Sequence, residues 1–87
     1  MTLAECIGPA VQRRRLLLGM TQAQLAKLVQ THRPLVARVE SGRHTVTIET
    51  LERYADALQV RSSVLLAEAE KWLELECACT YPDEVAV

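Results

Sequence analysis

Helix-capping and helix-breaking residues divide this sequence into five short helical segments. Gly19 and Gly42 stand where a chain commonly leaves a helix in the left-handed conformation, and Pro34 lacks the N–H that a preceding helix would need. Thr21 and Gln24 have the spacing of a capping box, in which each side chain satisfies a free backbone N–H of the other residue. Because apolar residues recur at helical spacing between these points, we predict helices over residues 3–18, 22–29, 33–41, about 48–59 and 62–78.

The composition favours a single all-α domain. A chain of 87 residues can close one core but has no room for a separate sensor or catalytic domain. Aromatic residues make up 3% and Phe is absent, so the core must be built from Leu, Val, Ile and Ala, which favours small packed helices over a sandwich or barrel. No apolar run approaches the roughly 18 residues that span a bilayer, and Leu16 to Leu18 are too few for a signal-peptide core. We therefore expect no membrane association.

The three cysteines indicate a reduced chain. Cys6, Cys77 and Cys79 are odd in number and lack the spacing of a disulfide framework, which predicts a cytoplasmic protein. No His cluster accompanies Cys77 and Cys79, so ordinary thiols are favoured over a zinc site. No nucleophile, base and orienting group fall together, and no glycine-rich phosphate loop is present. The sequence therefore predicts no enzyme, no cofactor and no metal.

The charges are strongly segregated along the chain, although the net charge is only -1. Residues 1–45 hold seven Lys and Arg against two Glu, which gives +5, whereas residues 46–87 hold three against nine acidic residues, which gives -6. A basic half suits a polyanion such as nucleic acid. Charge alone leaves ordinary solvated surface as an equal alternative.

The two short helices predicted over 22–29 and 33–41 lie in the basic half and are joined by a short turn, which is the plan of a helix-turn-helix. The sequences Thr-Gln-Ala-Gln-Leu-Ala (21–26), Val-Ala-Arg-Val-Glu-Ser-Gly-Arg (36–43) and Ala-Leu-Gln-Val (57–60) closely resemble the phage-repressor and Cro-like helix-turn-helix family, also called the xenobiotic-response-element type. The resemblance extends without a gap from about residue 7 to 66. It implies a compact five-helix, lambda-repressor-like DNA-binding domain over residues 1–66. Residues 67–87 lie outside the resemblance, and their own pattern predicts a C-terminal helical extension followed by a short mobile tail.

The resemblance also implies roles for individual residues. A recognition helix over about 33–41 would enter the major groove of double-stranded DNA. The positions that match DNA-contacting residues of the family are Gln22, Thr31, His32, Arg33, Pro34, Arg38 and Arg43. Among these, Gln22 matches a residue that grips phosphate and braces the recognition helix, and Arg43 matches a phosphate contact. Arg15 and Glu40 match a pair that links the first helix to the end of the third.

Elementary chemistry supports some of these roles and leaves others open. The planar guanidinium of Arg can hydrogen-bond to the edge of guanine. Arg33 and Arg38 point about 140° apart on a helix, so one could contact bases while the other contacts the sugar-phosphate backbone of the DNA. His32 could equally be a helix cap or a base reader. Pro34 is favoured as a residue that shapes the helix start, and Val36 as a core residue. Arg13 and Arg14 are favoured as surface charges, and the pair of Arg15 and Glu40 as a stabilising ion pair.

The sequence departs from the family at two turns. Gln30 and Gln59 stand where glycine usually follows the second and fourth helices. A positive φ costs a residue other than glycine on the order of 1 kcal/mol. Either both glutamines accept this strain, or the turns differ from the usual geometry.

The last predicted helix is amphipathic, with more apolar surface than the edge of a small domain needs. A partner copy could bury this surface, which we favour, or the helix could fold back on its own bundle. The expected dimer interface consists of Leu65, Leu66, Ala69, Trp72 and Leu73, with Trp72 as its anchor.

These observations predict a homodimeric, sequence-specific transcriptional regulator that represses an inverted-repeat operator. The alternative is an antitoxin-type protein whose acidic segment from Glu68 to Glu84 binds a basic protein partner such as a toxin, while its helix-turn-helix autoregulates the operon.

Overall fold

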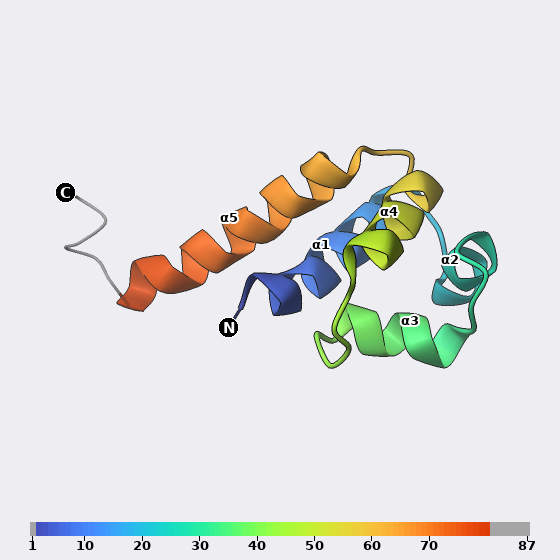
Figure 1. The fold of residues 1–87 in the computed structure, drawn as a ribbon, viewed down its shortest axis with the longest axis horizontal. Coiled ribbons are helices and arrows are strands. Elements are labelled where there is room, and N and C mark those ends of the chain that lie inside the picture. The colour runs from blue at the N-terminus through green and yellow to red at the C-terminus, as the bar shows by residue number, and fades with distance from the viewer. Residues whose placement is uncertain (1, 81–87) are drawn as a thin grey trace.

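The five predicted helices are all present in the computed structural model, which describes residues 2–80 and the side chains of residues 2–75. The helices are α1 (Leu3–Leu17), α2 (Gln22–Leu28), α3 (Arg33–Glu40), α4 (Ile48–Ala57) and α5 (Ser62–Thr80) (Figure 1). No strand occurs among residues 2–80. The expected all-α fold is therefore confirmed.

Side-chain caps fix where three of these helices begin. Thr21 accepts a hydrogen bond from the Gln24 N–H, and the Gln24 side chain accepts from the Thr21 N–H, which completes the predicted capping box. Thr47 caps α4 by accepting from the Thr50 N–H. A second capping box joins Thr2 to Glu5 at the start of α1, where the hydrogen bond from the Thr2 N–H lowers the pKa of the Glu5 carboxyl group.

Two glutamines adopt the conformation that glycine usually provides. Gln30 and Gln59 each have φ of 60°, close to the 69° of Gly19 and the 78° of Gly42. In each of the two glutamine turns the chain accepts the left-handed conformation, so the usual turn geometry is retained at the expense of local strain. Of the two alternatives left open by the sequence, the first is therefore confirmed.

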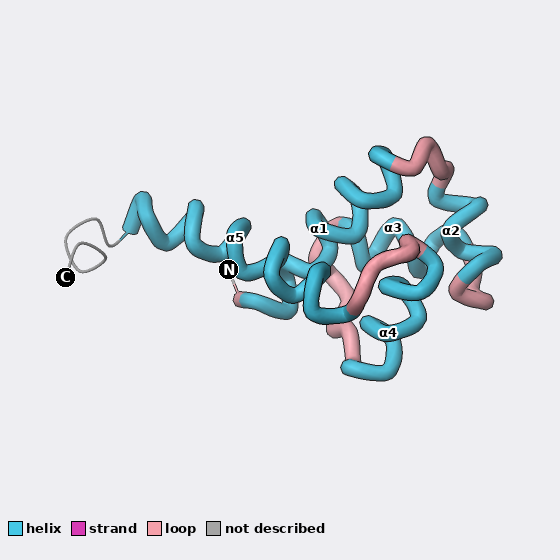
Figure 2. Tube along the Cα trace, turned by 90° about the horizontal axis from the view of Figure 1, so that it is seen from above, coloured by secondary structure: helices cyan, strands magenta, loops and turns pink. Residues whose placement is uncertain are grey.

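The long C-terminal helix α5 lies antiparallel to α1 and extends past the body of the bundle (Figures 1 and 2). It begins at Ser62 and continues to Thr80, two residues beyond its predicted end. The domain boundary expected after residue 66 falls inside this continuous helix. The expected mobile tail lies, from residue 81 on, outside the described residues.

One apolar core joins all five helices. Its buried members are Cys6, Ile7, Ala10, Val11, Leu25, Ala26, Val29, Val36, Val39, Leu51, Tyr54, Ala55, Leu58, Leu65 and Ala69. Leu65 and Ala69 are completely buried in this core, because the first half of α5 packs against α1 of the same chain. Our expectation that these two residues face a dimer partner is therefore corrected, and only Leu66, Trp72 and Leu73 of that set retain accessible surface.

Candidate nucleic-acid interface

The C-terminal end of α3 packs directly against α1 because residue 8 is a glycine. A Cβ atom built on Gly8 would collide with the carbonyl oxygen of Val39 and would lie 2.8 Å from that of Glu40. Such a contact is closer than packed atoms allow, so only glycine permits this approach of the two helices. The position of α3 in the domain therefore depends on a residue outside the helix-turn-helix itself.

A buried polar network fixes the same end of α3. The Arg15 guanidinium donates from Nε to Glu40 Oε2 at 2.6 Å and from Nη2 to Glu40 Oε1 at 3.1 Å. Its Nη1 donates to the Met20 carbonyl at 2.8 Å, and Gln22 Nε2 donates to Glu40 Oε1 at 3.0 Å. This geometry matches the expected pairing of Arg15 with Glu40 and the expected bracing of the recognition helix by Gln22. The network connects α1, the start of α2 and the end of α3.

The outer face of α3 is polar and cationic. Val36 and Val39 point into the core, whereas Arg33, Pro34 and Arg38 are exposed. At 100° per residue, Arg38 lies about 200° around the helix from Val36, so its side chain points away from the core. The structure therefore places Arg38 at the centre of the exposed face of α3, with Arg33 towards its flank.

The expected contact residues before α3 differ in exposure. His32 occupies the N-cap position, but its side chain makes no capping hydrogen bond and is exposed. The His32 side chain therefore does not cap α3. Thr31 is half-buried, and its N–H donates to the Ala26 carbonyl, which completes the turn after α2. Leu35 is also half-buried and faces α4 rather than open solvent.

The segment after α3 adds a further cation to this side of the domain. The Arg43 N–H donates to the Arg38 carbonyl at 3.0 Å, so the chain turns tightly around Gly42 and leaves the Arg43 side chain exposed.

The electrostatics of α3 follow from the burial of its one acidic residue. Between residues 31 and 45 the sequence has three arginines and a single carboxylate, Glu40. Glu40 is only 6% exposed and is paired with Arg15. The solvent-facing surface of this segment is therefore cationic, as a surface that contacts the phosphates of DNA requires.

Two residues that shape this region were missed by the sequence reasoning. Gly8 carried one available signal, since a glycine inside a helix costs up to about 1 kcal/mol relative to alanine and commonly marks a close approach. Tyr54 lies in the core, and nothing in the sequence indicated that its hydroxyl would be buried without a hydrogen-bond partner among the described residues. Burial raises the pKa of Tyr54, and the negative charge of Glu40 raises it further.

The residues that the structure describes contain no group of three or more His, Cys, Asp or Glu side chains that could hold a metal ion. None of the helices in this part of the chain combines the length and the hydropathy that a bilayer span requires. The side chains of Cys77 and Cys79 lie outside the described set.

A short helix that braces an exposed, cationic second helix across a tight turn defines a helix-turn-helix DNA-binding domain. The Helix-turn-helix family model matches residues 11–65. The chain therefore belongs to this family, of the xenobiotic-response-element type, and is a DNA-binding transcriptional regulator.

Solved structures of regulators have a similar fold. The clp gene regulator ClgR from Corynebacterium glutamicum is 27% identical with a TM-score of 0.88, covering 98% of this chain and 90% of that chain. The restriction-modification controller protein C.AhdI from Aeromonas hydrophila is 28% identical with a TM-score of 0.66, covering 72% and 90%. The controller protein C.Esp1396I, solved as a tetramer in complex with its natural 35 base-pair operator, is 27% identical with a TM-score of 0.73, covering 82% and 93%. No curated protein sequence matches the chain.

Proposed function

We propose that this protein is a homodimeric repressor that recognises an inverted-repeat operator through α3. The observation that carries the proposal is the exposed face of α3, which presents Arg33, Pro34 and Arg38 while its single carboxylate is buried against Arg15. Repression needs only that the bound protein exclude polymerase from promoter DNA, which a small domain on an operator can do.

Within this proposal the residues divide between reading bases and holding phosphates. Arg38 points straight away from the core, so it is assigned to a base edge in the major groove, where Arg most commonly contacts guanine. Arg33 and His32 flank the start of α3 and are assigned to base edges or the adjoining backbone. Thr31 and Arg43 are assigned to phosphates because they lie at the turns before and after α3, and Gln22 is assigned to phosphate as the first residue of α2.

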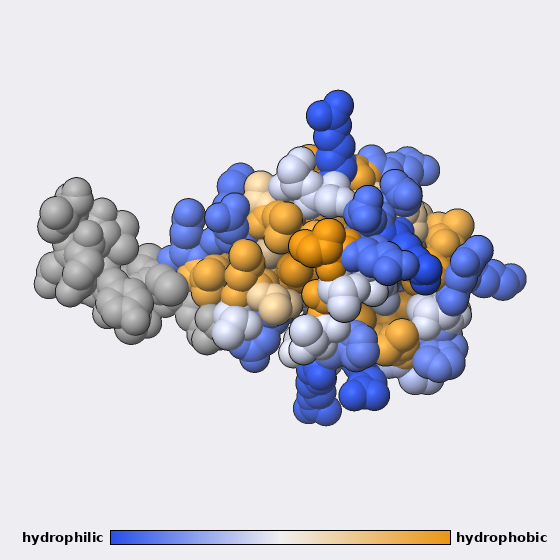
Figure 3. All heavy atoms as spheres, in the orientation of Figure 1, coloured by the Kyte–Doolittle hydropathy of each residue, from blue (hydrophilic) through white to orange (hydrophobic). Residues whose placement is uncertain are grey.

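Dimerisation is proposed through the exposed part of α5. Trp72 is 42% exposed, and Leu66 and Leu73 of the same helix are half-buried. Hydrophobic surface follows α5 beyond the body of the bundle (Figure 3). Two-fold symmetry would present two copies of α3 to successive major grooves about 34 Å apart. The operator-bound tetramer of C.Esp1396I supports an oligomer in this family.

The antitoxin alternative stays a prediction. About half of its acidic segment, residues 76–84, lies outside the described side chains, and Glu68 itself is paired with Arg14 inside the fold. A small enzyme that co-purifies in stoichiometric amount from the native host would favour this alternative.

The proposed function is tested by selecting bound DNA from a random pool at fixed salt concentration. The expected result is a symmetric motif whose half-sites are one helical turn apart, and light scattering should show a dimer. As a matched pair, Trp72→Glu should give monomers, whereas Ala67→Glu, at another exposed position of α5, should remain dimeric. A selected motif without symmetry would contradict the dimer, and the absence of any enriched sequence would contradict specific recognition.

A further inference from the structure

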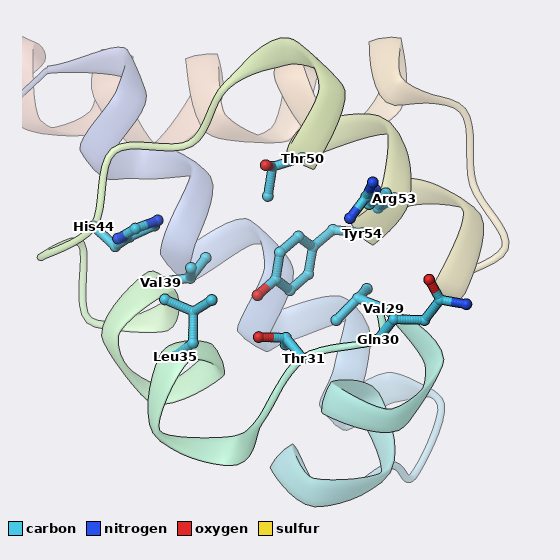
Figure 4. A pocket seen from close by; sticks show the side chains of 9 residues that line it. All are labelled: Val29, Gln30, Thr31, Leu35, Val39, His44, Thr50, Arg53 and Tyr54. Atoms are coloured by element: carbon cyan, nitrogen blue, oxygen red, sulfur yellow. The ribbon is translucent and has the colours of Figure 1, made fainter.

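A pocket of about 140 Å³ lies between α3 and α4, beside the turn that precedes α3 (Figure 4). Val29, Leu35 and Val39 and the ring of Tyr54 supply its apolar lining. An apolar cavity of about 150 Å³ in a protein core is known to hold one benzene ring. The volume and the lining of this pocket therefore suit a single six-membered ring.

The hydroxyl group of Tyr54 gives this pocket an unsatisfied donor. Tyr54 is 2% exposed, and its Oη atom has no hydrogen-bond partner among the described residues. Figure 4 shows Oη directed between Thr31 and Leu35, both of which line the pocket. A tyrosine hydroxyl is protonated at neutral pH, so Oη is a donor without an acceptor in the described part of the fold. Since Oη is enclosed, a small rotation of the Leu35 or Thr31 side chain is needed before a ligand can reach it.

The remaining lining residues are polar and include a cation but no carboxylate. Thr50, His44 and Arg53 lie around the apolar part (Figure 4). Arg53 is held only loosely, because its Nη2 lies 3.4 Å from Glu49 Oε1 and its side chain is 59% exposed. Arg53 can therefore turn to an anion bound in the pocket. The negative charge of Glu40, which also raises the pKa of Tyr54, disfavours an anion beside the Tyr54 hydroxyl.

We propose that this pocket binds a small aromatic carboxylate, with its ring against Tyr54 and its carboxylate towards Arg53. Such a ligand would contact Thr31 and Leu35, which belong to the turn before α3 and to α3 itself, and it would therefore act as an effector beside the recognition helix. The lining does not include Arg33, Arg38 or Arg43, which are assigned to DNA, but it shares Thr31 with the proposed phosphate contacts. If no ligand binds in this pocket, the proposed operator binding is unaffected. Operator affinity measured on the same sample therefore shows whether the pocket proposal or the DNA-binding proposal has failed.

The test is a titration of the ¹⁵N-labelled full chain with sodium benzoate at constant pH and ionic strength, followed by amide chemical shifts. We expect saturable shifts concentrated at Val29, Thr31, Leu35, Thr50 and Tyr54. Benzyl alcohol, which has the ring without the charge, should bind several-fold more weakly. Acetate, which has the charge without the ring, should give no saturable shifts at these residues.

Variants place the ligand within the pocket. Thr50→Leu fills the pocket and should abolish the benzoate shifts, whereas Thr45→Leu, at an exposed position outside the lining, should leave them unchanged. Arg53→Gln should weaken benzoate at least fivefold and leave benzyl alcohol unaffected. Arg61→Gln, an exposed arginine outside the lining, is its matched control.

The proposal is overturned if benzoate gives no saturable shifts, if the shifts scatter over the surface, or if acetate reproduces them, which would indicate an adventitious anion only. Equal weakening by Arg53→Gln and Arg61→Gln would also overturn it. Should Thr50→Leu fail to give a dispersed spectrum, the location of the wild-type shifts and the Arg53→Gln result still decide the question.

Discussion

Arg15 in α1 donates two parallel hydrogen bonds to Glu40 at the end of α3. Both side chains are nearly inaccessible to solvent, with exposures of 9% for Arg15 and 3% for Glu40. The pair fixes the direction of α3 relative to the core and also removes the one negative charge from its outer face. A single contact thus serves both the geometry and the electrostatics of DNA binding.

Breaking this pair should destabilise the fold strongly. Glu40→Gln leaves the Arg15 guanidinium buried without a counter-charge, so we expect the free energy of unfolding to fall by about 3–5 kcal/mol, measured by urea denaturation. The double variant Arg15→Met with Glu40→Leu removes both charges and should recover most of this loss. A loss below about 1 kcal/mol in Glu40→Gln would show that the pair does not hold α3.

Local signals in the sequence were sufficient to predict the helices and much of the candidate site. The capping box of Thr21 and Gln24 fixed the start of α2 correctly, because a cap depends on residues three positions apart. The assignments of Gln22, Arg15 and Glu40 came from the family resemblance, and their geometry agrees with it. What a helix packs against is a non-local property. An amphipathic stripe in α5 therefore could not show that α1 of the same chain covers Leu65 and Ala69.

The close contact between α1 and α3 predicts that Gly8→Ala destabilises the fold. The added methyl group meets the backbone carbonyl groups of Val39 and Glu40, which cannot move aside as a flexible side chain would. We expect a loss of about 1–3 kcal/mol in the free energy of unfolding and weaker operator binding, since α3 must shift. Gly19→Ala is the matched control, because a Cβ there meets no atom within 4 Å and only its φ of 69° is unfavourable. Unchanged or increased stability of Gly8→Ala, as expected for alanine at an unobstructed helical position, would contradict a packing role for Gly8.

The strained turn after α4 predicts that Gln59→Gly stabilises the protein. Gln59 has φ of 60°, which glycine adopts without strain, so the free energy of unfolding should rise by about 0.5–1 kcal/mol. The same substitution at Gln12, exposed within α1, should lower it by about 1 kcal/mol. Thermal or urea unfolding of the two variants measures both values, and a loss at both positions would refute the strain argument.

The buried hydroxyl group of Tyr54 predicts an alkaline loss of stability. Burial raises the pKa of Tyr54 above its ordinary value of about 10, so its contribution to stability is complete below that pH and declines as the pH rises further. Tyr54→Phe removes the ionisable group and an unpartnered donor. At neutral pH we expect the free energy of unfolding to rise by about 1 kcal/mol. The decline above pH of about 10 should be smaller in the variant than in the wild type, and parallel pH profiles would contradict this assignment.

The arrangement of α3 predicts different effects for its central arginine and for the arginine that follows it. Arg38 points away from the core into the proposed groove, so Arg38→Ala should abolish the preference for one base pair in each half-site, worth about 1–3 kcal/mol. Arg43 is assigned to phosphate, so Arg43→Ala should weaken all sequences by a similar factor and reduce the slope of log affinity against log salt by about 1.

Fluorescence anisotropy on the selected operator and on single-base variants, at several salt concentrations, measures both effects. Because both side chains are exposed, neither substitution should change the stability of the fold, which urea denaturation checks. If Arg38→Ala weakened every sequence equally, the assignment of Arg38 to a base edge would be wrong, and the direction of α3 in the groove would have to differ from the one proposed.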